Sequence, residues 1–137
     1  MKLPPEVRFH ENIRLLVYRP VGLLDEAAVN RIISVLGDLE ATTKDPFDRF
    51  TDTSQTDDVE LNFKYVIHVS LYRRLTYSRG PAVKSAILAT DKTIVHYARL
   101  HALLTQGSPI NVCIFQDRAE AAKWLGAPLR LLAGDDT

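Results

Sequence analysis

The last third of the chain alternates short apolar runs with amphipathic segments. Residues 82–89 form one apolar run, residues 91–106 carry apolar side chains at helical spacing, and residues 109–115 form a second apolar run. A segment rich in alanine, tryptophan and leucine then ends at Gly126. Short apolar runs separated by helical periods are typical of strands joined by helices. This alternation predicts an α/β layered fold.

The first third of the chain predicts a hairpin followed by a helix. Residues 7–10 and 13–18 are strand-like and flank a Glu-Asn pair. Because asparagine tolerates positive φ, we expect a tight antiparallel hairpin there. Its first strand lies at an edge and offers a contact for a homodimer, although the charged residues on it are typical of edge protection. Asp25 then precedes apolar residues at helical spacing, which predicts an N-cap and a helix ending near Glu40.

The middle of the chain predicts one further strand and one further helix. Residues 47–52 alternate apolar and polar side chains and are interpreted as a short strand. Asp57 and Glu60 have the spacing of a capping box, which predicts a helix that begins there and ends around Tyr77. The predicted element order is ββαβαβαβα. Since strands joined by helices pair in parallel, this order predicts an α/β fold with a mixed five-stranded sheet and helices on both faces.

Length, charge and cysteine content limit the classes of function. A chain of 137 residues fits a single domain, which we place at residues 1–137 with an ordered core at about 7–126. Its 17 basic and 17 acidic side chains cancel, so no overall field favours nucleic acid as a partner. No apolar run approaches the ~20 residues of a transmembrane helix, and the single cysteine, Cys113, agrees with a reducing compartment. We therefore expect a cytoplasmic protein without a transmembrane segment.

Sequence motifs indicate no particular reaction. The chain has no Gly-x-Ser-x-Gly elbow, no phosphate-binding glycine loop and no dinucleotide fingerprint. His96 and His101 are five residues apart, whereas a spacing of about four would place two imidazoles on one helical face. We therefore predict no catalytic residue, no metal site and no cofactor.

Acidic residues follow the ends of three predicted strands. Asp52, Asp91 and Asp117 occupy these places, and open α/β sheets bind ligands at this edge. One interpretation is a cation site or an acid–base pair formed by Asp52 and Asp91. The other is that Asp91 and Asp117 are helix N-caps, which is the more frequent role of an aspartate before a helix. Asp52 and Asp91 thus form a candidate strand-end site.

Basic and aromatic side chains concentrate on the helix predicted at residues 58–77 and on its exit. One interpretation is a site for a lipid head group, a phosphorylated ligand or an acidic partner, bound by Arg73, Arg74 and Arg79. The alternative is that Arg73 and Arg74 only complement the carbonyl end of the helix. In the first interpretation, apolar residues of the same helix line the rest of the ligand site: Phe63, Ile67 and Leu71.

The end of the chain carries a further pattern. Phe115 begins the run F-x-D-x-x-E-A-x-x-W-L, which ends at Leu125. With this run and the predicted element order, the chain resembles the SpoIIAA-like family of bacterial proteins from about Val7 to Gly126. The resemblance implies a fold related to the STAS anti-sigma-factor antagonists and to the CRAL-TRIO lipid-binding domains. Most members of the family have no assigned function.

One difference from the STAS antagonists bears on function. They carry an Asp-Ser-Ser/Thr-Gly-like segment whose hydroxyl is phosphorylated, whereas the corresponding predicted helix start here is Asp57-Asp58-Val59-Glu60. The role that we favour is a non-catalytic domain that binds a lipid, another apolar or amphipathic ligand, or a membrane surface through the helix at residues 58–77. The alternative is a STAS-type regulatory module that binds a protein partner but lacks the usual phosphoacceptor.

Overall fold

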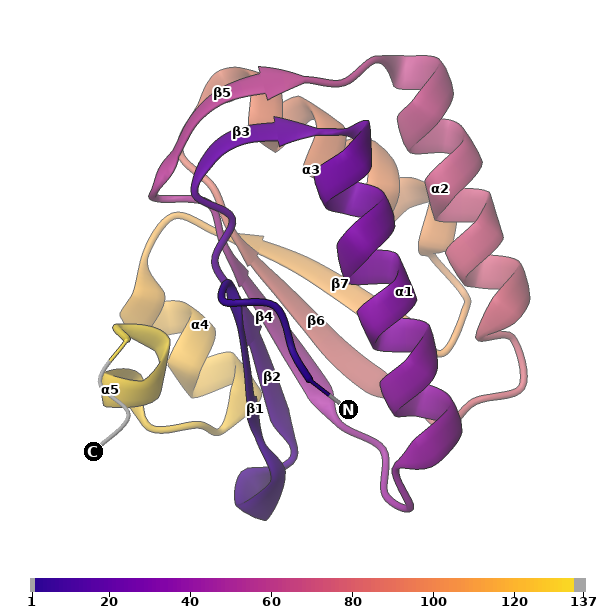
Figure 1. The fold of residues 1–137 in the computed structure, drawn as a ribbon, viewed down its shortest axis with the longest axis vertical. Helices are drawn as coiled ribbons and strands as arrows, with labels where there is room; N and C mark the ends of the chain where they lie inside the picture. The colour runs from indigo at the N-terminus through magenta and orange to yellow at the C-terminus, as the bar shows by residue number, and fades with distance from the viewer. Residues whose placement is uncertain (1, 135–137) are drawn as a thin grey trace.

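The computed structural model describes residues 2–134 and shows a mixed sheet with helices packed on both faces (Figure 1). The strands of this sheet are β1 (Val7–His10), β2 (Leu15–Tyr18), β4 (Asp48–Asp52), β6 (Val83–Leu88) and β7 (Ile110–Phe115). They lie in the order β1-β2-β4-β6-β7, with β1 antiparallel to β2 and every other neighbouring pair parallel. This order confirms the predicted mixed five-stranded sheet of an α/β fold.

Helices cover both faces of the sheet, as the element order predicted. One face is covered by α1 (Glu26–Thr42), α2 (Phe63–Thr76) and α3 (Lys92–Thr105), and the other by α4 (Arg118–Leu125) and α5 (Leu129–Leu132) (Figure 1). The short helix α5 was not predicted. Figure 1 places the α4–α5 pair on one side of the sheet and α1 with α2 on the other.

Alternation of side chains along the strands distributes the apolar residues between these two layers. Successive residues of a strand point to opposite faces. Phe50 of β4 and Ala86 of β6 are fully buried and pack with Ala121 of α4 and Leu132 of α5. Leu16 of β2 points the other way, into the cluster that includes the apolar face of α1. Because Leu132 belongs to this core, the packed part of the chain extends beyond Gly126.

The structure contains a second, two-stranded sheet that was not predicted from the sequence, and this sheet overturns one prediction. It consists of β3 (Gly22–Asp25) and β5 (Thr56–Glu60), which pair in parallel and lead into α1 and α2 (Figure 1). The predicted capping box at Asp57 and Glu60 is therefore wrong, because β3 supplies backbone partners that hold these residues extended. Asn62 caps α2 instead: its side-chain oxygen accepts the backbone N–H of Tyr65 at 2.8 Å.

The predicted hairpin is present, but its turn differs. The connection between β1 and β2 is a short 3-10 helix, η1 (Glu11–Ile13). Arg14, rather than the asparagine, has the left-handed backbone, with φ of 53°. The 3-10 helix places the chain reversal at Arg14, whose N–H donates to the carbonyl oxygen of Glu11 at 3.2 Å.

The three aspartates predicted as N-caps cap helices. The Asp25 carboxylate accepts the N–H of Ala28 at 2.9 Å, which starts α1. Asp91 caps α3 and Asp117 caps α4 in the same way. Each cap satisfies N–H groups that the first helical turn leaves without a partner. Helix α1 runs to Thr42, slightly beyond the predicted end.

Candidate functional site

The two central strands of the main sheet carry polar residues on the face that α1, α2 and α3 cover. Arg49 and Thr51 of β4 and Ser85 of β6 point to this face, whereas Phe50 and Ala86 point to the other. A parallel strand that is covered on both faces is normally apolar throughout. Polar side chains at these positions therefore indicate an interior space that is not filled by hydrophobic packing.

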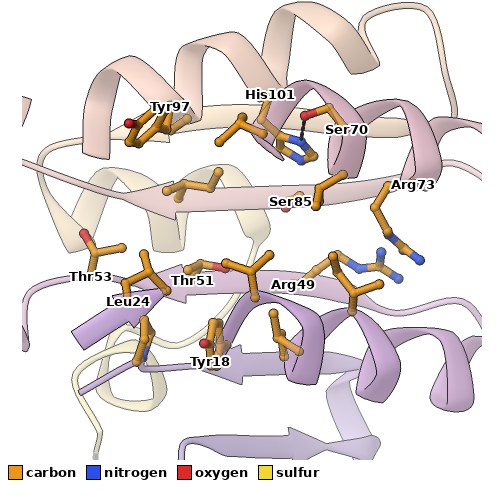
Figure 2. Close-up of a pocket in the computed structure, with 18 of the residues that line it drawn as sticks. Tyr18, Leu24, Arg49, Thr51, Thr53, Ser70, Arg73, Ser85, Tyr97 and His101 are labelled. Carbon is orange, nitrogen blue, oxygen red and sulfur yellow. Dashed lines mark hydrogen bonds between the residues drawn. The ribbon is translucent and has the colours of Figure 1, made fainter. Parts of the chain in front are cut away.

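A cavity of about 210 Å³ occupies this space, between the sheet and the three helices. Figure 2 shows Leu24, Thr53 and Tyr97 toward one end of the cavity and Arg49 with Arg73 at the other. The walls between these ends are mostly apolar and come from all three helices: Val29, Ile32, Ile33, Leu36, Val66, Val69, Ile94 and Ala98. The cavity thus has mostly apolar walls on its helical side, polar residues on its sheet side and two cations at one end.

The cationic end is built from three charged side chains on three different elements. Both oxygens of the Glu40 carboxylate, on α1, accept N–H groups of Arg73 on α2, at 3.0 and 2.5 Å. The same carboxylate lies 3.0 Å from Nη1 of Arg49 on β4. Arg49 and Arg73 are each 5% exposed. One partly buried carboxylate therefore serves two buried guanidinium groups, and the cluster carries one surplus positive charge.

Arg49 is only partly satisfied by its surroundings. Its Nε and Nη2 atoms are buried and have no hydrogen-bond partner among the residues that the structure describes. The guanidinium carbon lies 4.5 Å from the ring centre of Phe47 and 5.5 Å from that of Tyr77, so aromatic rings provide part of its environment. Burial lowers the pKa of Arg49, and Glu40 acts against this by favouring the charged form. Buried donors of a charged group that have no partner are costly, so this position is a candidate for binding an external acceptor.

A serine–histidine pair lines the same cavity. The hydroxyl oxygen of Ser70 lies 2.8 Å from Nδ1 of His101, and Figure 2 shows the pair bridging α2 and α3. Burial lowers the pKa of His101 to about 4, and the positive charge of Arg73 acts in the same direction. His101 is therefore neutral at neutral pH and adds hydrogen-bonding capacity to the cavity without adding charge.

A second, more polar cavity of about 420 Å³ lies beyond the two arginines. Ile33, Arg49 and Arg73 line both cavities, so they form the boundary between them. Lys44, after α1, and Arg79, after α2, line only this outer cavity. A molecule whose apolar part occupies the inner cavity would thus have its polar end directed toward the outer one.

The structure separates the residues that the sequence grouped into one ligand site. Arg73 and Arg79 both line the outer cavity. Arg74 does not: its Nη1 donates to the carbonyl oxygens of Leu104 and Gln106, at the end of α3. The apolar members of the predicted site lie on the outer, exposed face of α2 and not in the inner cavity: Phe63, Ile67 and Leu71.

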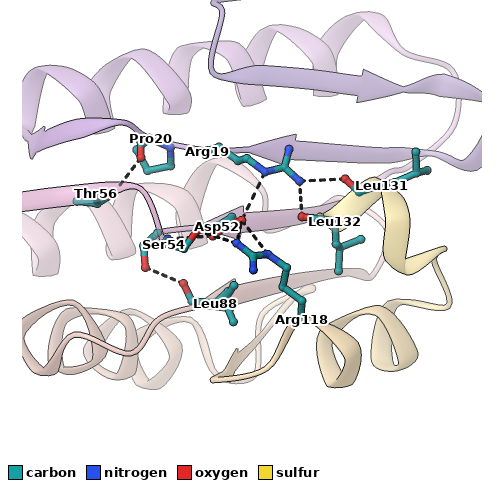
Figure 3. Close-up of polar contacts among 10 residues, drawn as sticks. Arg19, Pro20, Asp52, Ser54, Thr56, Leu88, Arg118, Leu131 and Leu132 are labelled. Atoms are coloured by element: carbon teal, nitrogen blue, oxygen red, sulfur yellow. Dashed lines mark hydrogen bonds and ion pairs between the residues drawn. The ribbon is translucent and has the colours of Figure 1, made fainter. Parts of the chain in front are cut away.

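The candidate strand-end site is occupied by structural interactions. Figure 3 shows Asp52 held between Arg19 and Arg118, with Oδ2 at 3.4 Å from Nε of Arg19 and 2.9 Å from Nη2 of Arg118. Burial alone would raise the pKa of Asp52, but hydrogen bonds from Ser54 and Arg118 outweigh it and hold the pKa below its usual range. Asp91 caps α3 through the N–H groups of residues 93 and 94.

The geometry offers no metal centre within the described part of the chain. Over residues 2–134, no three histidine, cysteine, aspartate or glutamate side chains lie close enough together to hold a metal ion. Within the same range, no helix has the length and apolar character needed to cross a membrane.

Sequence reasoning missed Arg49, Glu40, Ser70 and His101. Residues 47–52 alternate polar and apolar side chains in the sequence, and the strand order of the sheet places them in its central strand. Such alternation is typical of a strand with one solvated face, and here both faces are covered. The three other residues carry no local signal, because their partners lie about thirty positions away.

Comparisons with known proteins agree with this architecture. A structure from Shewanella loihica PV-4, an uncharacterised protein of the DUF3478 family with a SpoIIAA-like fold, superposes with a TM-score of 0.55. The match covers 87% of this chain and 90% of the other chain, at 16% sequence identity. A scan against protein-family models and a search of curated proteins each gave no match. The chain therefore has a SpoIIAA-like fold, as the sequence pattern indicated.

Proposed function

We propose that the protein is a non-catalytic, cytoplasmic domain that binds an amphipathic small molecule in the cavity between the sheet and α1, α2 and α3. The main support is the composition of this cavity, which combines apolar walls with the buried cation Arg49 at one end. Ligand pockets are typically apolar with a few well-placed polar groups. An amphipathic molecule matches both parts of the cavity.

The energetic setting also supports a ligand. Protein interiors are close-packed, and an unfilled apolar space forfeits contacts that its lining would otherwise make. On the other face of the same strands, Phe50 and Ala86 are fully buried and packed. The cavity is therefore a local departure from tight packing in a sheet that packs well elsewhere. A bound molecule would restore the missing contacts.

Native mass spectrometry of gently purified full-length protein tests this proposal. We expect a discrete non-covalent adduct that disappears when the protein is unfolded and that organic extraction recovers. The variant Ser85→Leu places a larger side chain in the cavity from β6 and should lose the adduct. A spectrum of the bare chain, with no uptake of added octan-1-ol, would contradict the proposal.

The outer face of α2 supports a second candidate function, attachment to a membrane surface. Four apolar side chains follow one another at a spacing of four residues and are exposed by 39–74%: Phe63, Ile67, Leu71 and Leu75. Lys64 and His68 are exposed on the same helix. Exposed apolar side chains beside basic ones are typical of helices that lie at an anionic lipid interface.

Vesicle sedimentation tests the second candidate. The variant Leu71→Glu should lose association with anionic vesicles. Leu129→Glu on α5 is the matched control, because both leucines are 48% exposed but lie on different helices, and it should behave as wild type. Arg73 is a poor probe because it is buried against Glu40. If vesicle binding is absent and Leu71→Glu instead loses a stoichiometric protein partner, the outer face of α2 belongs to a regulatory interaction module.

A further inference from the structure

We propose that the ligand of the inner cavity is a monocarboxylic acid with a chain of roughly eight carbon atoms, whose carboxylate binds Nε and Nη2 of Arg49. This inference rests on the proposed function, because it specifies the chemical class of the molecule that the cavity binds. It depends on the geometry of Arg49, on the charge of its cluster and on the size and lining of the cavity.

The two unpartnered donors of Arg49 lie on the same edge of its guanidinium group. Nη1 faces Glu40 at 3.0 Å, which leaves the edge formed by Nε and Nη2 without a partner among the described residues. A guanidinium edge presents two parallel N–H groups, and a carboxylate accepts both through its two oxygens. The donors that the protein leaves free therefore have the geometry that a carboxylate matches.

The charge of the cluster favours a monoanion. Arg49 and Arg73 are positive, Glu40 is negative, and the neighbouring His101 is neutral, so one positive charge is not balanced inside the cluster. Uncompensated buried charge is strongly unfavourable. A carboxylate supplies one negative charge, whereas a phosphate monoester carries about −1.5 to −2 at neutral pH. The carboxylate is the closer match.

No acidic side chain in the described lining of the inner cavity competes with a ligand carboxylate for Arg49. Among the described residues that line the inner cavity, no aspartate or glutamate occurs, and the polar ones besides the two arginines are neutral hydroxyls and the His101 ring. An incoming carboxylate would thus meet no competing acidic group in this lining, and it would reach Nε and Nη2 of Arg49, which are buried in this structure, by displacing the side chains that cover them. Its chain would lie against the aliphatic side chains of α1, α2 and α3.

The volume of the cavity limits the length of the chain. A dry apolar cavity of about 150 Å³ binds benzene, which has six carbon atoms. Scaling by volume, 210 Å³ corresponds to roughly eight carbon atoms. A longer acid would have to separate the helices or extend past Arg49 into the outer cavity, which Lys44 and Arg79 also line.

Calorimetric titration of the full-length protein with octanoate and with octan-1-ol tests the proposal. The two probes have the same chain length, and only the first is charged. We expect the wild type to bind octanoate at least about tenfold more tightly than octan-1-ol, the effect of a charge-assisted, bidentate contact. Among acids from hexanoate to hexadecanoate, affinity should be highest near eight to ten carbons, in line with the cavity volume.

Variants separate the carboxylate contact from binding in general. Arg49→Met, which leaves the Glu40–Arg73 pair intact, should remove the preference for octanoate while binding of octan-1-ol persists. Arg74→Met is the matched control, because Nη1 of Arg74 donates to carbonyl oxygens at the end of α3 and Arg74 lies outside both cavities. It should retain the wild-type preference. Unfolding curves establish that each variant is folded.

Three results would overturn the inference. Equal binding of both probes by the wild type, or an octanoate preference that survives Arg49→Met, would remove Arg49 as the anchor while leaving the proposed function intact. Binding of neither probe by the wild type would overturn the inference together with the proposed function.

Discussion

The two faces of the main sheet are built from the same strands but differ in how they are filled. Toward α4 and α5, Phe50, Ala86 and Leu132 are fully buried in one apolar cluster. Toward α1, α2 and α3, the neighbouring residues of the same strands are Arg49, Thr51 and Ser85, and they border a cavity. Adjacent residues of one strand thus point to opposite faces, one of which is closely packed while the other borders an open, partly charged cavity.

This difference indicates a division of roles within one small fold. Close packing on the α4–α5 face supplies hydrophobic stabilisation, which grows with the apolar area removed from water. The other face retains a cavity and a guanidinium group with unpartnered donors, both of which lower stability. We infer that the α4–α5 face stabilises the fold and that the opposite face provides the binding site.

The largest expected effect is on stability and comes from a comparison of two adjacent residues of β4 that face opposite sides of the sheet. Phe50→Ala should destabilise the protein by about 3–5 kcal/mol, because it leaves a void in the packed cluster. Thr51→Val, on the cavity face, should change the free energy of unfolding by less than about 1 kcal/mol. Urea unfolding followed by circular dichroism measures both. A loss of less than about 1 kcal/mol for Phe50→Ala would show that the α4–α5 face is not closely packed.

Removal of the shared carboxylate should have the next largest effect. Glu40→Gln leaves two buried guanidinium groups without a negative partner, and we expect it to destabilise the protein by about 3 kcal/mol. The double variant Glu40→Gln with Arg49→Met removes one of these charges and should recover part of the loss. Chemical denaturation of the single and double variants gives the comparison. If the two changes were simply additive, the surplus charge would not be coupled to Glu40.

Acid should lower the free energy of unfolding through protonation of His101, which lines the inner cavity. Its pKa is about 4 in the folded protein, below the ordinary value of 6.5, so the unfolded chain binds more protons between these values. Stability is therefore highest above about pH 6.5 and falls as the pH drops toward 4, by up to about 3 kcal/mol from this residue. His101→Gln should flatten the slope in this window.

The smallest effect is a gain in stability. Arg49→Met removes a buried charge with unpartnered donors and replaces it with an apolar side chain of similar length. We expect the ligand-free protein to become more stable by about 1 kcal/mol, since such replacements are often neutral or stabilising. Thermal denaturation without added ligand measures it. A loss of several kcal/mol would instead mean that Arg49 is needed for the fold.

Predictions from the sequence were correct where an element depends on residues close to it in the chain, and they failed where it depends on distant residues. Caps at Asp25, Asp91 and Asp117 were predictable because each aspartate bonds an N–H group two or three residues away. The capping box at Asp57 was wrong because β3, far earlier in the chain, pairs with this segment as a strand. Phe63, Ile67 and Leu71 were correctly grouped on one helical face, but their periodicity does not say whether that face turns inward.

The sequence by itself determined helices α1 to α4, the five strands of the main sheet and the α/β order, because these depend on periodicity and caps within a few residues. Only the tertiary structure decided that Glu40 would meet Arg49 and Arg73, and that Ser70 would meet His101. Burial of these polar groups depends on how helices distant in sequence pack over the central strands. The binding site proposed for this protein is therefore a property of that packing.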